Sequence, residues 1–282
     1  MGHKKILIYR RGGLGDSLLI FPIAEIYKKL GWEVHLVGNT DAFQLALEVG
    51  FASKVFSELP NVETYDEVIL ISVKKFINAP NIKWIYPFPT SNEHITEYYL
   101  KKLDLRKYTF SEILPIERFT DWDKYIILHP GSGSEKKNPP LELYKNLYLL
   151  LEKQGFSPLF VIGEAELTLV EQLKTFRTYK VKNLLLFAKL LKGAKGYIGN
   201  DSGFSHLSGY LGTPTIVLFG PTNPKIWKPL GKRVKVLYKG LECSPCFPAD
   251  CHQIPIKKCL LYEPHYIFNS LKNLLKPASG GK

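Results

Sequence analysis

The sequence contains no apolar run that approaches the roughly 18–20 residues needed by a membrane-spanning helix. Its first apolar stretch, Ile6–Tyr9, is too short for the core of a signal peptide, and the charged residues Arg10 and Arg11 follow it directly. Such a short apolar run is typical of a first β-strand. We therefore expect a cytoplasmic protein.

Acidic residues are few beside basic ones: 26 Asp and Glu stand against 38 Lys and Arg, which gives a formal net charge of +12. A basic surface favours anionic partners such as nucleic acid, an acidic membrane or a phosphorylated substrate, although surplus lysine also simply favours solubility. The sequence lacks a helix-turn-helix or RNA-binding signature, and its charges are spread along the chain. We therefore expect no nucleic-acid partner and keep nucleic-acid binding as a minor alternative.

The length of 282 residues and the apolar share of 45% suit two domains, each with its own core. Short apolar runs alternate with helical patterns, which predicts an α/β protein with parallel sheets. The expected strands are Lys5–Tyr9, Glu33–Val37, Glu67–Ile71, Ile82–Tyr86, Tyr125–His129, Pro158–Ile162, Gly196–Gly199, Thr215–Phe219 and Val234–Tyr238. The expected helices are Asp16–Leu30, Asp41–Val49, His94–Leu103, Leu141–Gln154, Glu166–Phe176, Ser202–Leu211 and Pro264–Lys276.

The pattern weakens and then restarts near residue 120. We predict a Rossmann-like domain over residues 1–120, a second over 121–262, and a C-terminal helix with a flexible tail over 263–282. In sheets of this type, ligands bind at the carboxyl ends of the strands. The loops that follow the strands are therefore the first places to look for chemistry.

The first such loop, residues 10–16, contains three glycines that allow a tight turn. It is a poor dinucleotide fingerprint, because Leu18 stands where a third glycine is needed and the second strand ends in Gly38-Asn39 without an acidic residue. What remains is Asp16 at a helix start. Its carboxylate can be an N-cap or a general base, and the sequence leaves both open.

The second loop, residues 129–140, offers hydroxyls, free amides and the ammonium groups of Lys136 and Lys137. Asn138 as N-cap with Pro139 at the first helical position predicts a helix start there. These groups suit phosphate, although the spacing is not that of a Walker loop. A flexible polar loop without function is the alternative.

The third loop opens a helix at Ser202-Gly203, where amides and the positive end of the helix dipole favour an anion. His206 lies four residues after Ser202 and shares its helix face, although a lone histidine is more often structural. Thr222 follows a further strand, in a segment that reads equally well as a turn.

Two pairs of acidic residues are also possible ligands. Glu164 and Glu166 follow a strand of the second half, and either could bind a ribose or simply belong to a solvated helix start. Asp121 and Asp123 form an Asp-x-Asp pattern that holds a metal in some glycosyltransferases. Because this short pattern falls in the expected linker, we set it aside.

The cysteines gather late in the chain, at Cys243, Cys246, Cys251 and Cys259. Four thiolates can form a tetrahedral zinc site. The usual zinc pattern has two Cys-x2-Cys pairs and this chain has one, so free thiols and disulfides stay open beside a structural zinc.

Taken together, the loops resemble glycosyltransferase family 9, the bacterial heptosyltransferases of lipopolysaccharide synthesis. The resemblance covers nearly the whole chain. It depends on four pieces in order: Gly15-Asp16 with Pro22, the segment from His129 to Ser132, the segment from Asp201 to His206, and the segment from Gly220 to Thr222.

The resemblance implies a GT-B fold, with two Rossmann-like domains facing a central cleft, the acceptor domain first and the donor domain second. It implies an inverting transfer without a metal ion, in which Asp16 is the base and Lys136 binds phosphate. The family's Lys-x-Trp-Pro pattern has Asn138 in place of tryptophan here, and Lys137 is also basic. The expected donor-side residues are Ser132, Lys136, Asp201, Ser202, Gly203, His206 and Thr222, and the expected acceptor-side residues are Arg10, Arg11 and Gly15.

We therefore expect transfer of a sugar, a heptose from ADP-heptose, onto an acidic glycolipid of the lipopolysaccharide core or lipid A-Kdo type. The enzyme would need no cofactor for catalysis and would contact the inner membrane peripherally. The alternatives are a UDP- or GDP-sugar donor, a sugar-nucleotide epimerase on the same architecture, and a sugar-nucleotide-binding module that has lost catalysis.

Overall fold

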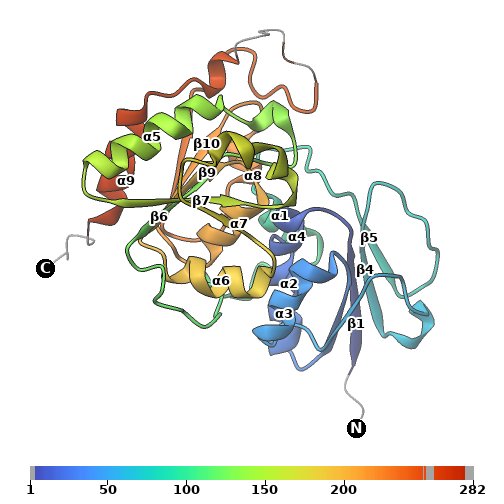
Figure 1. Cartoon of the computed structure of the whole chain (residues 1–282). Coiled ribbons are helices and arrows are strands. Elements are labelled where there is room, and N and C mark those ends of the chain that lie inside the picture. Colours follow the sequence, from blue (N-terminus) through green and yellow to red (C-terminus); the bar gives the residue numbers. More distant parts are fainter. Residues whose placement is uncertain (1–3, 250, 252–256, 277–282) are drawn as a thin grey trace, which may run out of the picture. The chain divides into compact units, whose positions relative to one another are not determined.

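The computed structural model describes residues 4–249, 251 and 257–276. The chain divides into two compact units, Met1–Ile116 and Glu117–Lys282 (Figure 1). We describe each unit separately.

The first unit is built on a five-stranded parallel sheet in the order β3-β2-β1-β4-β5. Its strands are β1 (Lys5–Arg10), β2 (Glu33–Gly38), β3 (Lys54–Phe56), β4 (Glu67–Ile71) and β5 (Ile82–Ile85). Its helices are α1 (Leu14–Leu18), α2 (Phe21–Lys29), α3 (Thr40–Glu48), the short 3-10 helix η1 (Val62–Thr64) and α4 (Ile95–Lys102).

Both faces of this sheet are covered, which explains the continuous apolar run in β1. Ile6, Leu7 and Ile8 are all fully buried, as is usual for a central parallel strand. On one face, α2 and α3 pack against β2. Leu7 lies on the other face, where Val37 and Val68 pack with Tyr65 from the segment before β4.

The expected single helix over Asp16–Leu30 is wrong, because the structure has two helices there. The first begins two residues earlier, at Leu14, and ends at Leu18. The second begins at Phe21 with Pro22 in its first turn. Proline has no amide to donate to the carbonyl four residues before it, so a helix that runs through this position is interrupted.

The second unit is built on a six-stranded parallel sheet in the order β11-β10-β9-β6-β7-β8. Its strands are β6 (Tyr125–His129), β7 (Ser157–Ile162), β8 (Thr178–Lys180), β9 (Gly196–Asn200), β10 (Thr215–Phe219) and β11 (Val234–Tyr238). Its α-helices are α5 (Leu141–Lys153), α6 (Leu184–Gly193), α7 (Gly203–Tyr210), α8 (Pro224–Trp227) and α9 (Pro264–Leu275). Its 3-10 helices are η2 (Glu135–Lys137), η3 (Glu164–Leu169), η4 (Glu171–Leu173) and η5 (Lys258–Leu260).

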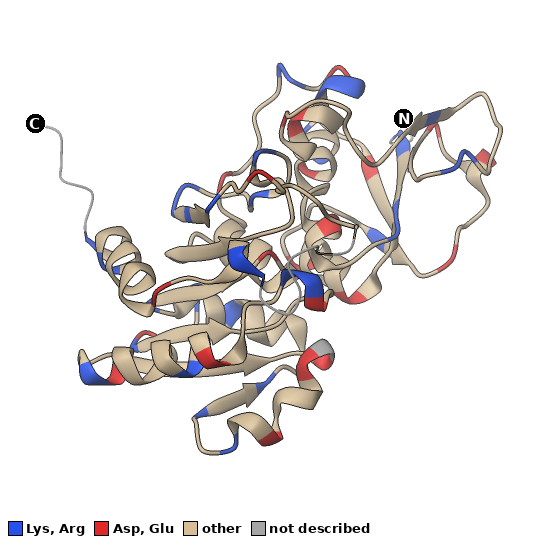
Figure 2. Cartoon of the chain, turned by 90° about the horizontal axis from the view of Figure 1, so that it is seen from above, with Lys and Arg blue, Asp and Glu red and all other residues tan. Residues whose placement is uncertain are grey.

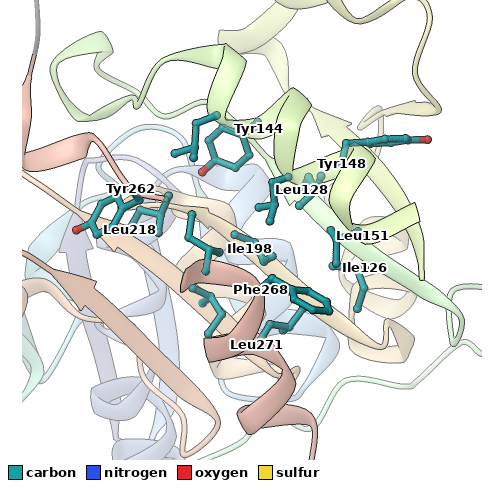
Figure 3. Close-up of a cluster of buried hydrophobic side chains, with 14 of the residues drawn as sticks. Ile126, Leu128, Tyr144, Tyr148, Leu151, Ile198, Leu218, Tyr262, Phe268 and Leu271 are labelled. Atoms are coloured by element: carbon teal, nitrogen blue, oxygen red, sulfur yellow. The ribbon is translucent and has the colours of Figure 1, made fainter. Parts of the chain in front are cut away.

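A large core joins the last helix to this sheet (Figure 3). Phe268 and Leu271 of α9 pack with Tyr144 of α5 and with Ile198 and Leu218 of the central strands. The helix α9 contacts α5 and β10. The C-terminal helix that we assigned to a separate segment is therefore part of the core of the second unit.

One further expectation for this unit is wrong, and one helix was missed. The expected helix over Glu166–Phe176 is replaced by η3 and η4, where the β-branched Thr168 and Val170 and the tertiary contacts of Glu166 work against a regular helix. The helix α6 was not predicted, because its sequence is too uniformly apolar to show a helical stripe. Its N-cap is Asn183, whose side chain accepts a hydrogen bond from the Leu186 amide at 2.8 Å.

Among the described residues, no helix combines the length and the apolar character that a membrane span requires. Figure 2 shows the lysines and arginines distributed over helices, strands and loops, with acidic residues among them. The basic excess of the chain is thus not carried by a single arm.

Candidate active site

The loop after β1 holds Asp16 by two contacts. Arg10, the last residue of β1, is buried and forms an ion pair through its Nη2 with Asp16 Oδ1. The other carboxylate oxygen, Oδ2, accepts a hydrogen bond from the Gly13 amide at 3.0 Å. The Asp16 side chain remains 32% exposed, so the carboxylate has a fixed orientation and still meets solvent.

The glycines of this loop have distinct roles. Gly13, not Asp16, occupies the N-cap position of α1, but Asp16 still caps this helix, because its side chain in the first turn accepts from the Gly13 amide. A Cβ on Gly12 would lie 2.7 Å from both Cβ and Oδ2 of Asp16. Only a glycine at position 12 therefore allows the Asp16 side chain its observed position.

A hollow of about 330 Å³ lies next to this loop, at the carboxyl ends of β1, β2 and β3. It is lined by Arg11, Gly12, Gly38, Asn39, Ser57 and Glu58. Arg11 donates from Nη2 to Glu58 Oε2 at 3.1 Å, and both side chains are largely exposed. An exposed pair of this kind exchanges readily with a competing anion.

In the second unit, three loops meet at the carboxyl ends of the adjacent strands β6, β9 and β10. Asp201, directly after β9, is the residue on which they converge. Its Oδ2 accepts a hydrogen bond from Thr222 Oγ1 at 2.8 Å and lies 3.3 Å from Lys137 Nζ. Its Oδ1 lies 3.9 Å from His206 Nε2. The structure thus brings together Asp201, Thr222 and His206, three of the residues expected on the donor side.

The two lysines of η2 take different places. Lys137 reaches Asp201, and its side chain is only 18% exposed. Lys136 instead donates from Nζ to the Pro248 carbonyl at 2.8 Å. The basic group that joins the expected donor residues is therefore Lys137, one position after the lysine that we predicted.

The helix α7 starts as predicted. Ser202 is its N-cap, and its Oγ accepts from the Ser205 amide at 3.4 Å. The first amides of a helix, here those of Gly203 and Phe204, have no acceptor within the helix and carry the positive end of its dipole. Ser202 and His206 are both buried. The N-terminus of α7 therefore combines a hydroxyl, free amides and a partial positive charge, beside Lys137.

Asn138 does not cap a helix, which corrects our prediction. The helix α5 begins at Leu141, with Pro140 at its N-cap position. The Asn138 carbonyl oxygen Oδ1 lies 2.7 Å from Ser132 Oγ and 3.2 Å from Asn200 Nδ2. Asn200 in turn donates to the Pro130 carbonyl at 2.8 Å. Pro139 stands directly before another proline, which disfavours the helical conformation at position 139. The helix therefore starts later, and Asn138 instead ties the 129–140 loop to the end of β9.

A buried contact between a histidine and a glutamate, which the sequence did not predict, lies behind these loops. His129 Nε2 is 3.4 Å from Glu166 Oε2, and His129 Nδ1 is 3.3 Å from Ser202 Oγ. Burial alone would raise the pKa of Glu166, but His129 and the Gly163 amide more than offset it, so the pKa is lowered from its ordinary value. Of the two ribose candidates, Glu166 is thus inside the site, whereas Glu164 is exposed.

The only sequence signal for this pair was the position of His129 at the end of a buried strand. The position of Glu166 also explains why residue 131 is a glycine, because a Cβ there would lie 2.0 Å from Glu166 Cγ. His129 and Glu166 connect β6, η3 and the N-cap of α7, and they fix the base of the site.

All four cysteines carry free thiols. Burial, followed by the charges of neighbouring cysteines, raises the pKa of Cys246 and of Cys259, so the fold gathers them in one region. Within residues 4–249, 251 and 257–276, no three His, Cys, Asp or Glu side chains are arranged to hold a metal ion. A structural zinc at these cysteines, which the sequence left open beside free thiols and disulfides, thus gains no support from the described residues.

A family model described as glycosyltransferase family 9 (heptosyltransferase) matches residues 87–257, which is more than half of the chain. The chain belongs to glycosyltransferase family 9. The resemblance of the loops to this family is thus confirmed.

Several relatives support the assignment. Over 167 residues, the chain is 31% identical to lipooligosaccharide heptosyltransferase 2 of Campylobacter jejuni, which covers 54% of this chain and 51% of that protein. Over 71 residues, it is 37% identical to lipopolysaccharide heptosyltransferase 1 of Pseudomonas aeruginosa, which covers 25% and 20% of the two chains. The alignments therefore span about half or less of the length of these relatives.

The fold agrees over the whole chain. The structure of the E. coli ADP-heptose lipopolysaccharide heptosyltransferase II matches with a TM-score of 0.76 and 15% identity, over 96% of this chain and 98% of that one. With two parallel-sheet α/β units and neighbours of this kind, the GT-B fold class expected of a family 9 member is confirmed.

Proposed function

We propose that this family 9 chain is an inverting glycosyltransferase that moves a sugar from a nucleotide diphosphate onto a hydroxyl of an acidic glycolipid. The observation that carries the proposal is the convergence of Lys137, Thr222 and the N-terminus of α7 on Asp201, at the ends of three adjacent strands. Amides, a hydroxyl and an ammonium group gathered at strand ends suit a diphosphate.

In the proposed reaction, Asp16 removes the proton of the acceptor hydroxyl while its oxygen attacks the anomeric carbon. The bond from that carbon to the diphosphate oxygen breaks on the opposite face, and the configuration inverts. The support for this role is that Asp16 is held by Arg10 and the Gly13 amide yet stays partly exposed. A general base of this kind contributes about 100- to 10,000-fold to the rate.

The charge that develops on the leaving diphosphate needs stabilisation at fixed positions. We assign this to the basic pair of η2, with Lys137 as the principal group and Lys136 at its side, and to the amides at the start of α7. Ser132, Ser202 and His206 would complete the phosphate and sugar contacts, and Glu166 would bind the ribose. Catalysis in this scheme needs no metal or other cofactor.

ADP-heptose is the donor that we propose, because the E. coli structure with the same fold bears the name of an ADP-heptose heptosyltransferase. The acceptor would be a lipopolysaccharide core or lipid A-Kdo type glycolipid. Arg11 and Gly15, beside the hollow of the first unit, would face it together with Arg10. We place the enzyme in the cytoplasm, in peripheral contact with the inner membrane.

The first test is the thermal stability of the chain with ADP, UDP, GDP and CDP, in the presence of a chelator. A ligand at about 100 times its Kd stabilises the folded state by roughly 2.7 kcal/mol, which is a Tm shift of several degrees for a chain of this size. A shift with ADP alone supports the proposal. A shift with UDP or GDP instead would change the donor, and no shift with any nucleotide would refute the donor site.

The second test separates binding from catalysis. Asp16→Asn keeps the shape of the side chain and removes its basicity, so the donor-induced Tm shift should remain while turnover falls by about 100-fold or more. Turnover within a few-fold of the unchanged protein would remove Asp16 from the role of base.

A further inference from the structure

One segment of the first unit exposes an unusual number of apolar side chains. Five large hydrophobic residues between positions 73 and 88 are exposed, with exposed fractions of 41–56%: Val73, Phe76, Trp84, Tyr86 and Phe88. In the remainder of residues 4–116, only Leu30 and Ile113 are exposed to this degree. Single exposed apolar residues are ordinary, whereas a cluster of them marks a binding surface.

The three aromatic residues at the end of the segment share one face. Ile85 and Pro87 are buried while Trp84, Tyr86 and Phe88 are exposed, which is the alternation of an extended chain with one covered face. Tyr86 and Phe88 pack edge to face, with ring centroids 5.7 Å apart. The Trp84 indole is fixed by a hydrogen bond from Nε1 to the Ser72 carbonyl at 3.0 Å.

The strand register links Trp84 across the sheet to the loop of Asp16, through Leu70, which is itself fully buried. Trp84 pairs with Leu70 of β4, and Leu70 pairs with Tyr9 of β1, the residue before Arg10. The Tyr9 ring packs edge to face with Phe76, at a centroid distance of 5.3 Å. The exposed aromatics therefore lie on the same strand ends as the proposed acceptor site.

The charge of the segment is of one sign. Residues 72–91 contain Lys74, Lys75 and Lys83 and no aspartate or glutamate. Lys74 and Lys75 are exposed, and Lys83 pairs with Glu67 at 2.9 Å. Tryptophan and tyrosine beside lysine are typical of the interface between a bilayer and water, and lysine is attracted to anionic lipid.

We propose that residues 72–91, the basic-aromatic face, bind the surface of a bilayer that contains anionic phospholipid. The inference builds on the proposed function, because a glycolipid acceptor is presented at such a surface. A second copy of the chain is a poorer occupant, although β5 is the edge strand of its sheet. Pro87 and Pro89 lack the amides that an added strand would need beyond Tyr86.

The test measures partition of the full chain onto vesicles of phosphatidylcholine with and without 30% phosphatidylglycerol. Neither glycolipid acceptor nor donor is present. We expect binding to the anionic vesicles only, weakened roughly 30-fold by Lys74→Ala with Lys75→Ala, since each surface lysine contributes a factor of about five. The matched control, Lys101→Ala with Lys102→Ala, removes the same charge from exposed positions of α4 and should weaken binding less than threefold.

Two aromatic variants test the remainder of the face. Phe88→Ser should weaken binding by about tenfold. The control Tyr266→Ser should leave binding unchanged, although Tyr266 on α9 is at least as exposed as Phe88. Brominated lipid should quench part of the tryptophan fluorescence, and Trp84→Phe should abolish that part.

Three outcomes would overturn the inference: no preference for anionic vesicles, equal losses from both lysine pairs, or quenching that survives in Trp84→Phe. Self-association that Phe88→Ser abolishes, without vesicle binding, would assign the face to a second copy. Sugar transfer to an acceptor freed of its lipid chains tests the proposed function separately, so either proposal can fail alone.

Discussion

Replacement of Gly12 by alanine should strongly reduce the rate of sugar transfer while the first unit still folds. The new Cβ would lie 2.7 Å from both Cβ and Oδ2 of Asp16, about 1 Å closer than carbon atoms pack. The Asp16 side chain must then move by about 1 Å, which weakens its hydrogen bond with the Gly13 amide. Because a misplacement of about 1 Å can reduce a rate about 100-fold, we expect kcat to fall by that factor, with a loss of about 1–3 kcal/mol in unfolding free energy.

The neighbouring residue provides the control. A Cβ on Gly13 would meet Asp16 Oδ2 at 3.8 Å, an ordinary contact, and the Gly13 backbone is extended. Gly13→Ala should therefore keep turnover within a few-fold. The assay is the initial rate of nucleotide diphosphate release, with the donor-induced Tm shift as a check that the second unit is intact. Equal turnover of the two variants would refute the view that Gly12 sets the position of the base.

Three further predictions concern the second unit. Lys137→Ala should lower kcat/KM for the donor by about 100- to 1,000-fold, whereas Lys136→Ala should lower it less than tenfold. Steady-state kinetics with varied donor concentration measure both values. The reverse order would make Lys136 the principal phosphate-binding lysine. The pKa of Glu166 is lowered in the folded state, so its contribution to stability is complete above about pH 4.3 and is lost as the pH falls through the folded pKa. Between pH 7 and pH 3.5, the unfolding free energy measured with urea should thus fall less for Glu166→Gln than for the unchanged chain. Equal falls would contradict the effect of the His129 contact on Glu166. Leu271→Ala removes a fully buried side chain of α9 and should cost about 2–5 kcal/mol in the same assay; a loss below 1 kcal/mol would mean that α9 is not part of the core.

Four strands were the most predictable part of the fold; three lie inside their sheets, and the fourth, β11, is a partly exposed edge strand. The expected strands Glu67–Ile71, Tyr125–His129, Thr215–Phe219 and Val234–Tyr238 agree with the structure residue for residue. Buried parallel strands must be almost wholly apolar, so the sequence marks their limits clearly. The strands β3 and β8 have three residues each and no fully buried side chain, so nothing in their sequence distinguishes them from loops.

The site was predictable as a set of loops but not as a set of contacts. Glycine, serine and histidine after buried strands indicated where Asp16, Asp201 and Ser202 would lie. The choice between Lys136 and Lys137 depends on the turn of η2, in which consecutive side chains point in different directions. The pairing of His129 with Glu166 joins residues 37 positions apart, which no local pattern can specify.

The two aspartates of the proposed site show how one kind of ion pair can serve two different tasks. Asp201 has a side-chain exposure of 8% and is shared by Lys137 and Thr222, so an incoming hydroxyl has little access to it. Asp16 is four times as exposed, and its pairing with Arg10 occupies one oxygen while Oδ2 is held only by the Gly13 amide. A base must present a lone pair to its substrate, whereas a residue that positions a cation must not. The difference in exposure therefore supports the proposed removal of the proton by Asp16 and the placement of Lys137 by Asp201, although one carboxylate lies in the first turn of a helix and the other directly before a helix start.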